Sequence, residues 1–347
     1  MKNLIFICCI IIILFKTGNV LSDSDIFNVN NIEIDKETYK NKDKLVNKAF
    51  IIGYDRLINR LLMKGDYDRI SNVNLKEIKE LISYYQIINP EKEKLSNKIK
   101  VNVFFDKTRI HDFFYNKNIL YSDIINTEII LFPLFKKENK YFIYSQNYFY
   151  ENWIKESSNS LIQYFLPVEN IESIQKVNLI KDSIYDLDIS NFFKEYEINN
   201  KVFTEISINN NAADIFLIIK INEQKINKKI RIIKKENIND KDFYKKIILE
   251  INTIVTDLIK QQNLIDVRTP SFLNVKIILN NKNNLILLNN KLKKIDLINS
   301  FYVQKLNKDY ALVKIKYLGK IKKIINKLKK ENIYLKMHNG EWEIKIT

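Results

Sequence analysis

Cysteine is nearly absent from this sequence of 347 residues, because it occurs only twice, at Cys8 and Cys9. Both cysteines lie inside the first apolar run, so a mature chain that lacks this run contains no thiol. A disulfide framework and a cysteine-ligated zinc site are then excluded, and the fold must be stabilised by buried apolar cores. A chain of this length can build two or three such cores.

Glycine and histidine are also scarce, with five and two residues in the whole chain. The glycines never approach the spacing of a phosphate-binding loop, and no serine lies in a G-x-S-x-G elbow. The two histidines, His111 and His338, are far apart in sequence, and neither has a recognisable acid–base partner. We therefore predict no cofactor, no metal site and no catalytic residue, and we expect both histidines to be structural or surface residues.

Arginine is rare although the chain is basic, with a formal net charge of +16 from 57 basic and 41 acidic residues. Only six of the basic residues are arginine. Because nucleic-acid surfaces favour the planar guanidinium group, we predict no nucleic-acid partner. The densest basic stretch, KIKKIINKLKK from Lys320, has Ile321, Ile324, Ile325 and Leu328 at helical spacing, which predicts a solvated lysine face. Weak attraction of such lysines to anionic membranes stays open.

One apolar run, residues 4–15, lies close to the N-terminus and ends at Lys16. A helix over these twelve residues reaches roughly 18 Å, well short of a hydrocarbon core of about 30 Å. The run therefore predicts a signal peptide over residues 1–22, with cleavage between Ser22 and Asp23 and a periplasmic location. Two alternatives stay open: an uncleaved anchor in which Lys16 reaches the interface, and a lipoprotein, which the mid-run position of the cysteines disfavours.

Composition and periodicity divide the rest of the chain into three blocks of mixed α+β and α/β character. We predict an N-terminal α+β domain at residues 23–126, a central α/β domain at 127–267 and a C-terminal domain at 268–347. The N-terminal block reads as a βααββα module. Its first helix is expected to end near Gly65, and later helices to begin at Asn74, as LKEIKELISYY, and at Asp106.

The central block opens with an apolar run, IILFPLF, that is bounded like a buried strand. Three strand-like runs and one long helix, DFYKKIILEINTIVTDLIKQQ, follow and predict a mixed sheet with a helix across it. The C-terminal block alternates more regularly, in the order βαββαβ, and ends in a hairpin through Asn339 and Gly340. This order predicts a ferredoxin-like module, a fold that hosts many unrelated functions.

Four segments together resemble a known family. They are AFIIGYDRLINRLL, IKVNVFFDKTRIHDFF, IILFPLF and ALVKIKYLG, and their pattern is similar to that of the proteobacterial domain-of-unknown-function 2066 family, most closely over about residues 26–135. The resemblance implies an exported, periplasmic protein with several domains. It transfers no catalytic residue, because the shared motifs are packing patterns.

The stretch DLDISNFFKEYE, residues 186–197, has acidic and hydroxyl side chains at several positions of a calcium-binding loop. Its sixth position is Asn191 where the loop requires glycine, and its ninth is Lys194, a cation. We therefore favour a helix start capped by Asp188, with Phe192 and its aromatic neighbours packed inward.

Seven aromatic residues crowd KYFIYSQNYFYENWIK, residues 140–155. Most aromatic clusters of this kind form part of a core. If the chain has an aromatic contact surface for a glycan strand or a protein, it is expected here. Its members would be Tyr141, Tyr144, Tyr148, Tyr150 and Trp153.

Two acidic residues on the final strand, Glu341 and Glu343, flank Trp342 and share one strand face. A glycosidase also uses a pair of carboxylates. A solvated face of the hairpin, continued by Lys345, is the simpler interpretation.

We predict from these patterns an exported, non-enzymatic binding or assembly module of the cell envelope. Its partner would be an envelope protein or cell-wall glycan. A periplasmic hydrolase that works with carboxylates alone is the first alternative, since one sequence can hide such a site. A membrane-tethered assembly component, with residues 1–22 retained, is the second.

Overall fold

The structure is a computed structural model of the whole chain. The predicted signal peptide and its cleavage position, Ser22 and Asp23, lie outside the residues that it describes. The described residues are 26–35, 41–88, 98–124, 126–138, 140–157, 161–180, 184–209, 211–279, 283–338 and 340–346.

The protein is a mixed α/β protein whose chain forms two compact units. Unit 1 contains residues 1–59, 68–121 and 265–347, and unit 2 contains residues 60–67 and 122–264. The longer part of unit 2 covers most of the segment predicted as the central domain, residues 127–267. Most of the segment predicted as the N-terminal domain, and the whole segment predicted as the C-terminal domain, belong to unit 1, where each forms its own sheet.

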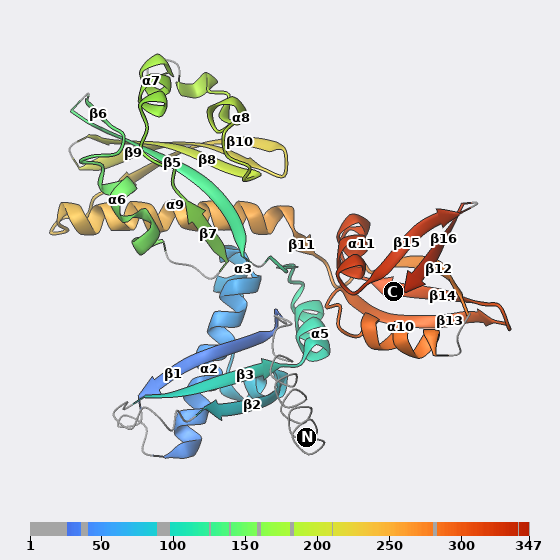
Figure 1. Cartoon of the computed structure of the whole chain (residues 1–347). Helices are drawn as coiled ribbons and strands as arrows, with labels where there is room; N and C mark the ends of the chain where they lie inside the picture. Colours follow the sequence, from blue (N-terminus) through green and yellow to red (C-terminus); the bar gives the residue numbers. More distant parts are fainter. Residues whose placement is uncertain are drawn as a thin grey trace, which may run out of the picture. The chain divides into compact units, whose positions relative to one another are not determined.

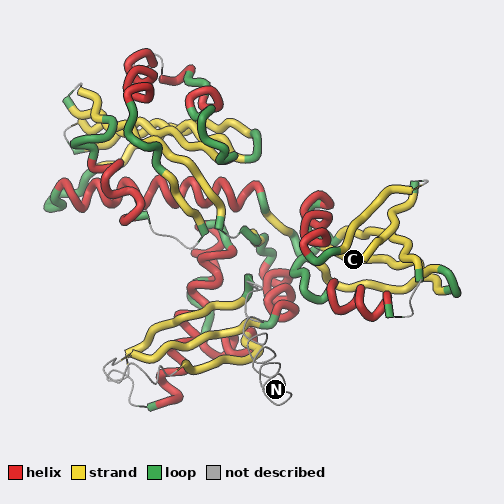
Figure 2. Tube along the Cα trace, viewed as in Figure 1, coloured by secondary structure: helices red, strands yellow, loops and turns green. Residues whose placement is uncertain are grey.

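The N-terminal part of unit 1 has a three-stranded antiparallel sheet in the order β1-β3-β2 (Figure 2). Helix α2 (Lys42–Leu61) lies close against it, because a Cβ atom at Gly53 would stand 3.2 Å from Cδ1 of Ile32 and 3.4 Å from Val103. Glycine thus allows this close approach of helix and sheet. The strands are β1 (Asn28–Asp35), β2 (Ile82–Ile88) and β3 (Lys98–Phe105).

The predicted helix starts in this part are confirmed. Asn74 caps α4 (Leu75–Leu81), because its side chain accepts from the backbone N–H of Glu77 at 3.0 Å. Asp106 caps α5 (Lys107–Lys117) in the same way and accepts from the backbone N–H of Arg109 at 3.0 Å. Each cap satisfies a backbone N–H that has no partner within its helix.

Two helix ends were predicted wrongly. The first helix ends at Leu61, and Gly65 lies inside a further short helix, α3 (Lys64–Ile70). The helix from Asn74 ends at Leu81, because the following ISYYQII segment forms strand β2. Its β-branched and aromatic side chains favour an extended backbone, and pairing with β3 supplies the backbone hydrogen bonds.

Unit 2 contains a six-stranded mixed sheet in the order β10-β9-β8-β5-β6, with β7 also paired to β5. Strand β5 contains the predicted IILFPLF run and is parallel to both β8 and β7, whereas β8, β9 and β10 are antiparallel neighbours. The strands are β5 (Thr127–Lys137), β6 (Lys140–Phe142), β7 (Ile162–Phe165), β8 (Asn200–Asn209), β9 (Ala212–Ile221) and β10 (Gln224–Ile233).

Both faces of this sheet are covered, which explains why β9 is buried along nearly its whole length. The long helix α9 (Asp240–Gln262) runs along one face together with α6 (Tyr148–Glu156) (Figure 1). The other face carries α7 (Ile171–Ile180), the 3₁₀ turn η1 (Ile184–Asp186) and α8 (Ile189–Phe192). The two layers form separate apolar cores on the two sides of the sheet.

The C-terminal part of unit 1 has the predicted order of elements, including the final hairpin. Strand β14 lies between β12 and β13 and is antiparallel to both, as in a split βαβ unit. The last strand, β16, lies between β12 and β15 and is parallel to β12, so the sheet has five strands. The elements are β12 (Ser271–Ile278), α10 (Asn284–Leu292), β13 (Ile298–Leu306), β14 (Tyr310–Tyr317), α11 (Ile321–Lys330), β15 (Ile333–His338) and β16 (Glu341–Ile346).

Strands β4 (Tyr121–Ser122) and β11 (Leu264–Ile265) pair with each other in a two-stranded sheet. Across the described parts of the chain, no helix combines the length and the apolar character that crossing a membrane requires.

Candidate functional site

Helix α7 of unit 2 carries apolar side chains on two sides. Its inner side packs into the core through Val177, which is buried. Its outer side carries Ile171 and Leu179, whose exposed fractions are 73% and 82%, and Val168 just before the helix is 73% exposed. Large aliphatic side chains this exposed are typical of contact surfaces when they gather in one place.

A hollow of about 270 Å³ opens beside this helix, between α7 and the η1–α8 segment. The buried residues Leu187 and Phe192 give it an apolar wall, and Leu179 stands at its rim. The remaining lining residues are polar and come from both sides: Lys176, Asp186, Asp188 and Asn191. We call this hollow the α7–α8 pocket.

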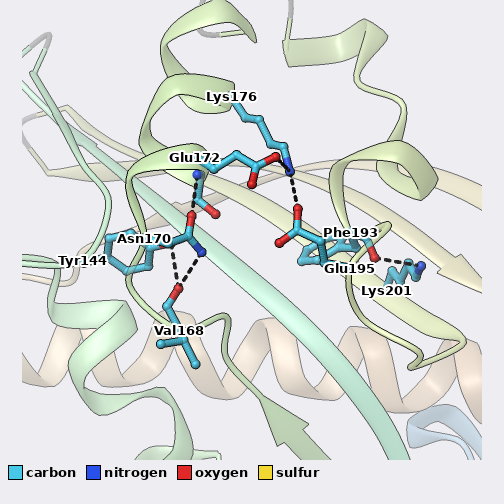
Figure 3. Close-up of polar contacts among 9 residues, drawn as sticks. Tyr144, Val168, Asn170, Glu172, Lys176, Phe193, Glu195 and Lys201 are labelled. Atoms are coloured by element: carbon cyan, nitrogen blue, oxygen red, sulfur yellow. Dashed lines mark hydrogen bonds and ion pairs between the residues drawn. The ribbon is translucent and has the colours of Figure 1, made fainter.

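The loop that leads into α7 is held by hydrogen bonds from two tyrosines. The hydroxyl of Tyr144 donates to the backbone carbonyl of Val168 at 3.3 Å, and that of Tyr150 donates to Pro167 at 2.8 Å. Burial raises the pKa of both phenols, so both remain protonated donors. Asn170 tightens the same turn by donating to the carbonyl of Val168 at 2.9 Å (Figure 3).

An ion-pair bridge joins α7 to the segment after α8. The ammonium of Lys176 lies 3.2 Å from a carboxylate oxygen of Glu172 and 3.0 Å from one of Glu195 (Figure 3). The hydrogen bond from Lys176 lowers the pKa of Glu195. Partial burial would lower the pKa of Lys176, but its bonds to Glu195 and Glu172 outweigh this effect and raise it.

Three lysines of the sheet hold the η1–α8 segment by hydrogen bonds from the strands that it covers. Each lies on a different strand and donates from its ammonium to an oxygen of that segment, one of them shown in Figure 3. Such charge-assisted bonds are stronger than neutral ones, so this wall of the pocket is pre-formed. The bonds join Lys201 to the carbonyl of Phe193 (3.3 Å), Lys220 to Oγ of Ser190 (3.1 Å) and Lys225 to the carbonyl of Leu187 (2.9 Å).

The stretch that imitates a calcium loop is a helix start, as predicted. Asp188 caps α8 by accepting from the backbone N–H groups of Ser190 and Asn191 at 2.9 and 3.3 Å. Phe192 and Phe193 are buried in the core beneath. Among the residues that the structure describes, no group of three or more His, Cys, Asp or Glu side chains could hold a metal ion.

The predicted aromatic contact surface is divided between core and surface positions. Trp153 and Tyr144 are buried, so neither can contribute to an exposed surface. Tyr141, Tyr148 and Tyr150 are half-buried and pack against the cores on the two sides of the sheet. The aromatic side chains of this segment therefore pack inward for the most part.

Asn147 organises this aromatic segment and was missed from the sequence. Its buried amide donates to three backbone carbonyls, those of Pro133 (2.7 Å), Phe142 (3.0 Å) and Ile143 (2.8 Å). Its oxygen caps α6 by accepting from the backbone of Phe149 and Tyr150. One side chain thus ties β5, the turn after β6 and α6 together, and only a cap could have been predicted from local sequence.

The two histidines have structural or surface positions, as predicted. His111 is buried in unit 1, with Nε2 3.1 Å from the hydroxyl of Tyr121 and its ring edge-on to Phe27. Burial, and to a smaller extent the charge of Lys107, lowers its pKa to about 4. His338 is exposed on β15 and pairs with Glu341 in the hairpin register.

A second hollow, of about 390 Å³, lies on the α7 side of the same sheet of unit 2. Glu205 lines it, and burial raises the pKa of this carboxyl group against the opposing charge of Lys136. Ser207 and Asp214 are adjacent in the register of β8 and β9, and Asp214 lies 3.6 Å from Arg231. A carboxyl group with a raised pKa beside a second carboxylate is the pattern that acid–base chemistry uses.

The exposed side of α7 was also missed from the sequence, although a signal exists. Five of the ten residues in IESIQKVNLI are large and aliphatic, and they do not fall on one helical stripe. A helix that is apolar on more than one side is buried on all sides or contacts a partner. This helix is short and flanked by loops, so its sequence is too brief for the periodicity to be recognised.

Comparison with known proteins gives no assignment. No family model matches the chain, and no curated protein matches it. The resemblance to the domain-of-unknown-function 2066 family therefore stays a prediction.

Two solved structures show a faint likeness. The lipoprotein GNA1162 from Neisseria meningitidis matches 38% of this chain over 99% of its own length, with 10% identity and a TM-score of 0.23. A second structure, titled an uncharacterized protein, matches 40% of this chain over 93% of its own, with 8% identity and a TM-score of 0.17. These scores are too low to establish a shared fold or function.

Proposed function

We propose that this chain is an exported, non-enzymatic binding module of the cell envelope that holds a protein partner at the α7–α8 pocket. The observation that carries the proposal is the apolar pocket beside Leu179, an exposed aliphatic side chain of α7. Location in the envelope rests on the apolar run at residues 4–15, whose length suits a signal peptide.

The pocket favours an apolar side chain that is flanked by positive charge. Leu187 and Phe192 offer an apolar wall, and burying one large aliphatic side chain there contributes about 1.5–3 kcal/mol. Asp186 and Asp188 stand at the rim, whereas Lys176, a cation that also lines the pocket, is already paired with Glu172 and Glu195. Charge complementarity therefore favours a partner segment with lysine or arginine next to its apolar anchor.

The fixed walls reduce the cost of binding. The loop before α7 is tied by tyrosine hydroxyls, and the η1–α8 segment is tied by the lysines of the sheet. A partner then orders few groups of this protein when it binds, which leaves more of the contact energy for affinity.

The test is site-directed photo-crosslinking in intact cells, with a benzophenone amino acid at position 179 and a C-terminal tag. Position 249 is the matched control, because Leu249 is also an exposed aliphatic residue but lies on α9, on the opposite side of the sheet. We expect a discrete protein adduct at position 179 only. The adduct should disappear when Asp186 and Asp188 are both replaced by lysine.

Equal adducts at both positions, or an adduct that the lysine substitutions leave unchanged, would contradict docking at this pocket. Removal of Asp188 also removes the cap of α8, so Asp188→Asn serves as a second control. It keeps the capping oxygen and removes one negative charge from the rim, a quarter of the charge change in the double lysine variant, so we expect an adduct of intermediate yield.

A carboxylate-based hydrolase is the second candidate, favoured by Glu205 alone. If the hollow beside Glu205 is catalytic, Glu205→Gln abolishes release of product from peptidoglycan or ester substrates and leaves thermal stability nearly unchanged. Two results would contradict this candidate. One is hydrolytic activity that persists in the Glu205→Gln variant, and the other is that the unsubstituted protein hydrolyses neither substrate class.

A membrane-tethered assembly component is the third candidate. It requires residues 1–22 to stay attached, so N-terminal sequencing of the protein from membranes separates it from the exported module.

A further inference from the structure

The C-terminal sheet has one buried face and one open face. In strand β14 the side chains of Ala311, Val313 and Ile315 are fully buried, whereas those of Lys314 and Lys316 between them are partly exposed. The helices α10 and α11 each bury an apolar stripe of their own in this module. Because side chains alternate along each strand, every second side chain points to the other face of the sheet, which is open to solvent.

Lysine dominates this open face. The pairing register places Lys314 beside Asn274, Lys276 beside Leu312, and Lys276 also beside Glu343. Following the register across all five strands gives the residues that we call the lysine face. Its cations are Lys276, Lys305, Lys314, Lys316, Lys336 and Lys345, and its carboxylates are Glu341 and Glu343.

Exposed apolar and aromatic side chains lie between these lysines. Phe272 on β12 is 50% exposed and Tyr302 on the edge strand β13 is 54% exposed. Ile278 at the end of β12 and Tyr334 on β15 are also exposed on the same face. Aromatic side chains next to lysines are typical of surfaces at the level of lipid headgroups.

Two lysines are held in place over aromatic rings. The ammonium of Lys314 lies 4.3 Å from the ring centroid of Phe272, and that of Lys276 lies 4.7 Å from the ring centroid of Tyr310. These contacts fix the two charges on the open face. They also cover one face of each of these two rings, which a sugar ring or a nucleobase would need for stacking.

We propose that the lysine face is a peripheral contact surface for a bilayer rich in anionic phospholipid. Lysine ammonium groups suit phosphate as point charges, and the apolar side chains among them can enter the interface. The covered rings of Phe272 and Tyr310 disfavour stacking of a glycan strand or single-stranded nucleic acid at the centre of the face. The proposal goes beyond the protein-binding function above and uses residues of unit 1 alone.

A hollow on this face is large enough for headgroups. It has a volume of about 520 Å³ and is lined on the open side by Phe272, Asn274, Lys276 and Gln304. The lysine and the two amide side chains can donate to phosphate oxygens, while Phe272 gives the hollow an apolar wall. Glu341 lies at the other end of the hollow and disfavours anions there.

The size of the effect follows from the number of lysines removed. A lysine near an anionic surface contributes about a fivefold increase in partitioning, so replacing two reduces partitioning roughly 30-fold. The variant is Lys276→Gln with Lys314→Gln. The matched control is Lys329→Gln with Lys330→Gln, two exposed lysines of α11. Both variants change the net charge equally.

The experiment measures co-sedimentation of the full chain with vesicles that contain 30% phosphatidylglycerol, and with vesicles of phosphatidylcholine alone. All proteins carry the same C-terminal tag, have the same N-terminus by mass spectrometry and are checked for folding by circular dichroism. We expect binding to anionic vesicles that falls with salt, a loss of roughly 30-fold in the lysine-face variant, and a loss of less than about threefold in the control.

A second reporter tests the orientation directly. Tyr302→Trp places an indole on the lysine face, and its emission should shift to the blue on anionic vesicles and be quenched by brominated lipid. Equal losses in the two double variants, no binding to anionic vesicles, or no shift at position 302 would overturn the proposal. Lysine-face-dependent binding to a soluble acidic polysaccharide but not to vesicles would overturn it in favour of a glycan.

Discussion

Acidification should destabilise the N-terminal part of unit 1 through His111. The imidazole is 6% exposed and contacts Phe27 and Tyr121, and burial lowers its pKa from 6.5 to about 4. Between these two pH values the unfolded chain binds the proton and the folded chain does not. The free energy of unfolding therefore falls as the pH falls from 6.5, and the loss is complete below about pH 4.

The magnitude follows from the pKa difference. A shift of this size corresponds to about 3 kcal/mol in the limit of low pH, and to roughly 2.5 kcal/mol at pH 4.5. The assay is backbone hydrogen exchange in α5, corrected for intrinsic rates, which gives the local free energy of opening at pH 7 and pH 4.5. In the His111→Gln variant this pH-dependent loss should shrink by the same amount, whatever the variant costs at pH 7.

His338→Gln is the matched control, because His338 is exposed and its replacement should leave the pH dependence in α5 unchanged. If His111→Gln shows the full pH-dependent loss of the unsubstituted protein, His111 is not the group that binds the proton. Removal of that loss by His338→Gln would equally contradict this assignment, because the proton would then bind elsewhere.

Three further predictions concern stability. Asn147→Asp replaces three donated hydrogen bonds by a carboxylate that faces backbone carbonyls. This change should lower the free energy of unfolding of unit 2 by about 3–5 kcal/mol, measured by urea titration. The control Asn152→Asp, in helix α6, should lower it by less than about 1 kcal/mol. Lys260, whose pKa burial lowers to about 8, donates to the carbonyl of Leu62 at 2.6 Å. Because the unfolded chain binds its proton up to about pH 10.5, the unsubstituted protein should gain stability between pH 8 and 10.5, and Lys260→Met should lack this gain in the same titrations. Asp106→Ala removes the cap of α5 and should lower the free energy of opening of this helix, measured by hydrogen exchange, by about 1 kcal/mol. Asp106→Asn keeps a capping oxygen and should lower it by less. Equal losses in the two variants would contradict capping by the side-chain oxygen.

Much of the secondary structure could be predicted because it depends on neighbours in sequence. Asn74, Asp106 and Asp188 cap helices through backbone groups two or three residues away, so the signal is local. The strands of the C-terminal module alternate with a period of two, which follows from the geometry of an extended chain. The same locality explains the wrong helix end at Leu81, since ISYYQII becomes a strand only when it pairs with β3.

The sites depended on distant segments and could not be predicted in the same way. The α7–α8 pocket exists because lysines on β8, β9 and β10 reach a segment that precedes them in the chain. The aromatic residues around Trp153 suited a core better than a surface but left both open, and packing against α9 and the sheet places most of them in the core.

The sequence by itself determined the absence of thiols from residues 10–347, the basic and lysine-rich surface, most helix starts and the order of elements in the C-terminal module. Only the tertiary structure decided that unit 2 has apolar layers on both faces of its sheet, that β16 inserts between β12 and β15, and that one side of α7 and one face of the C-terminal sheet stay exposed. The physical reason is that propensity and periodicity act over a few residues, whereas strand order and burial depend on which distant surfaces exclude water together.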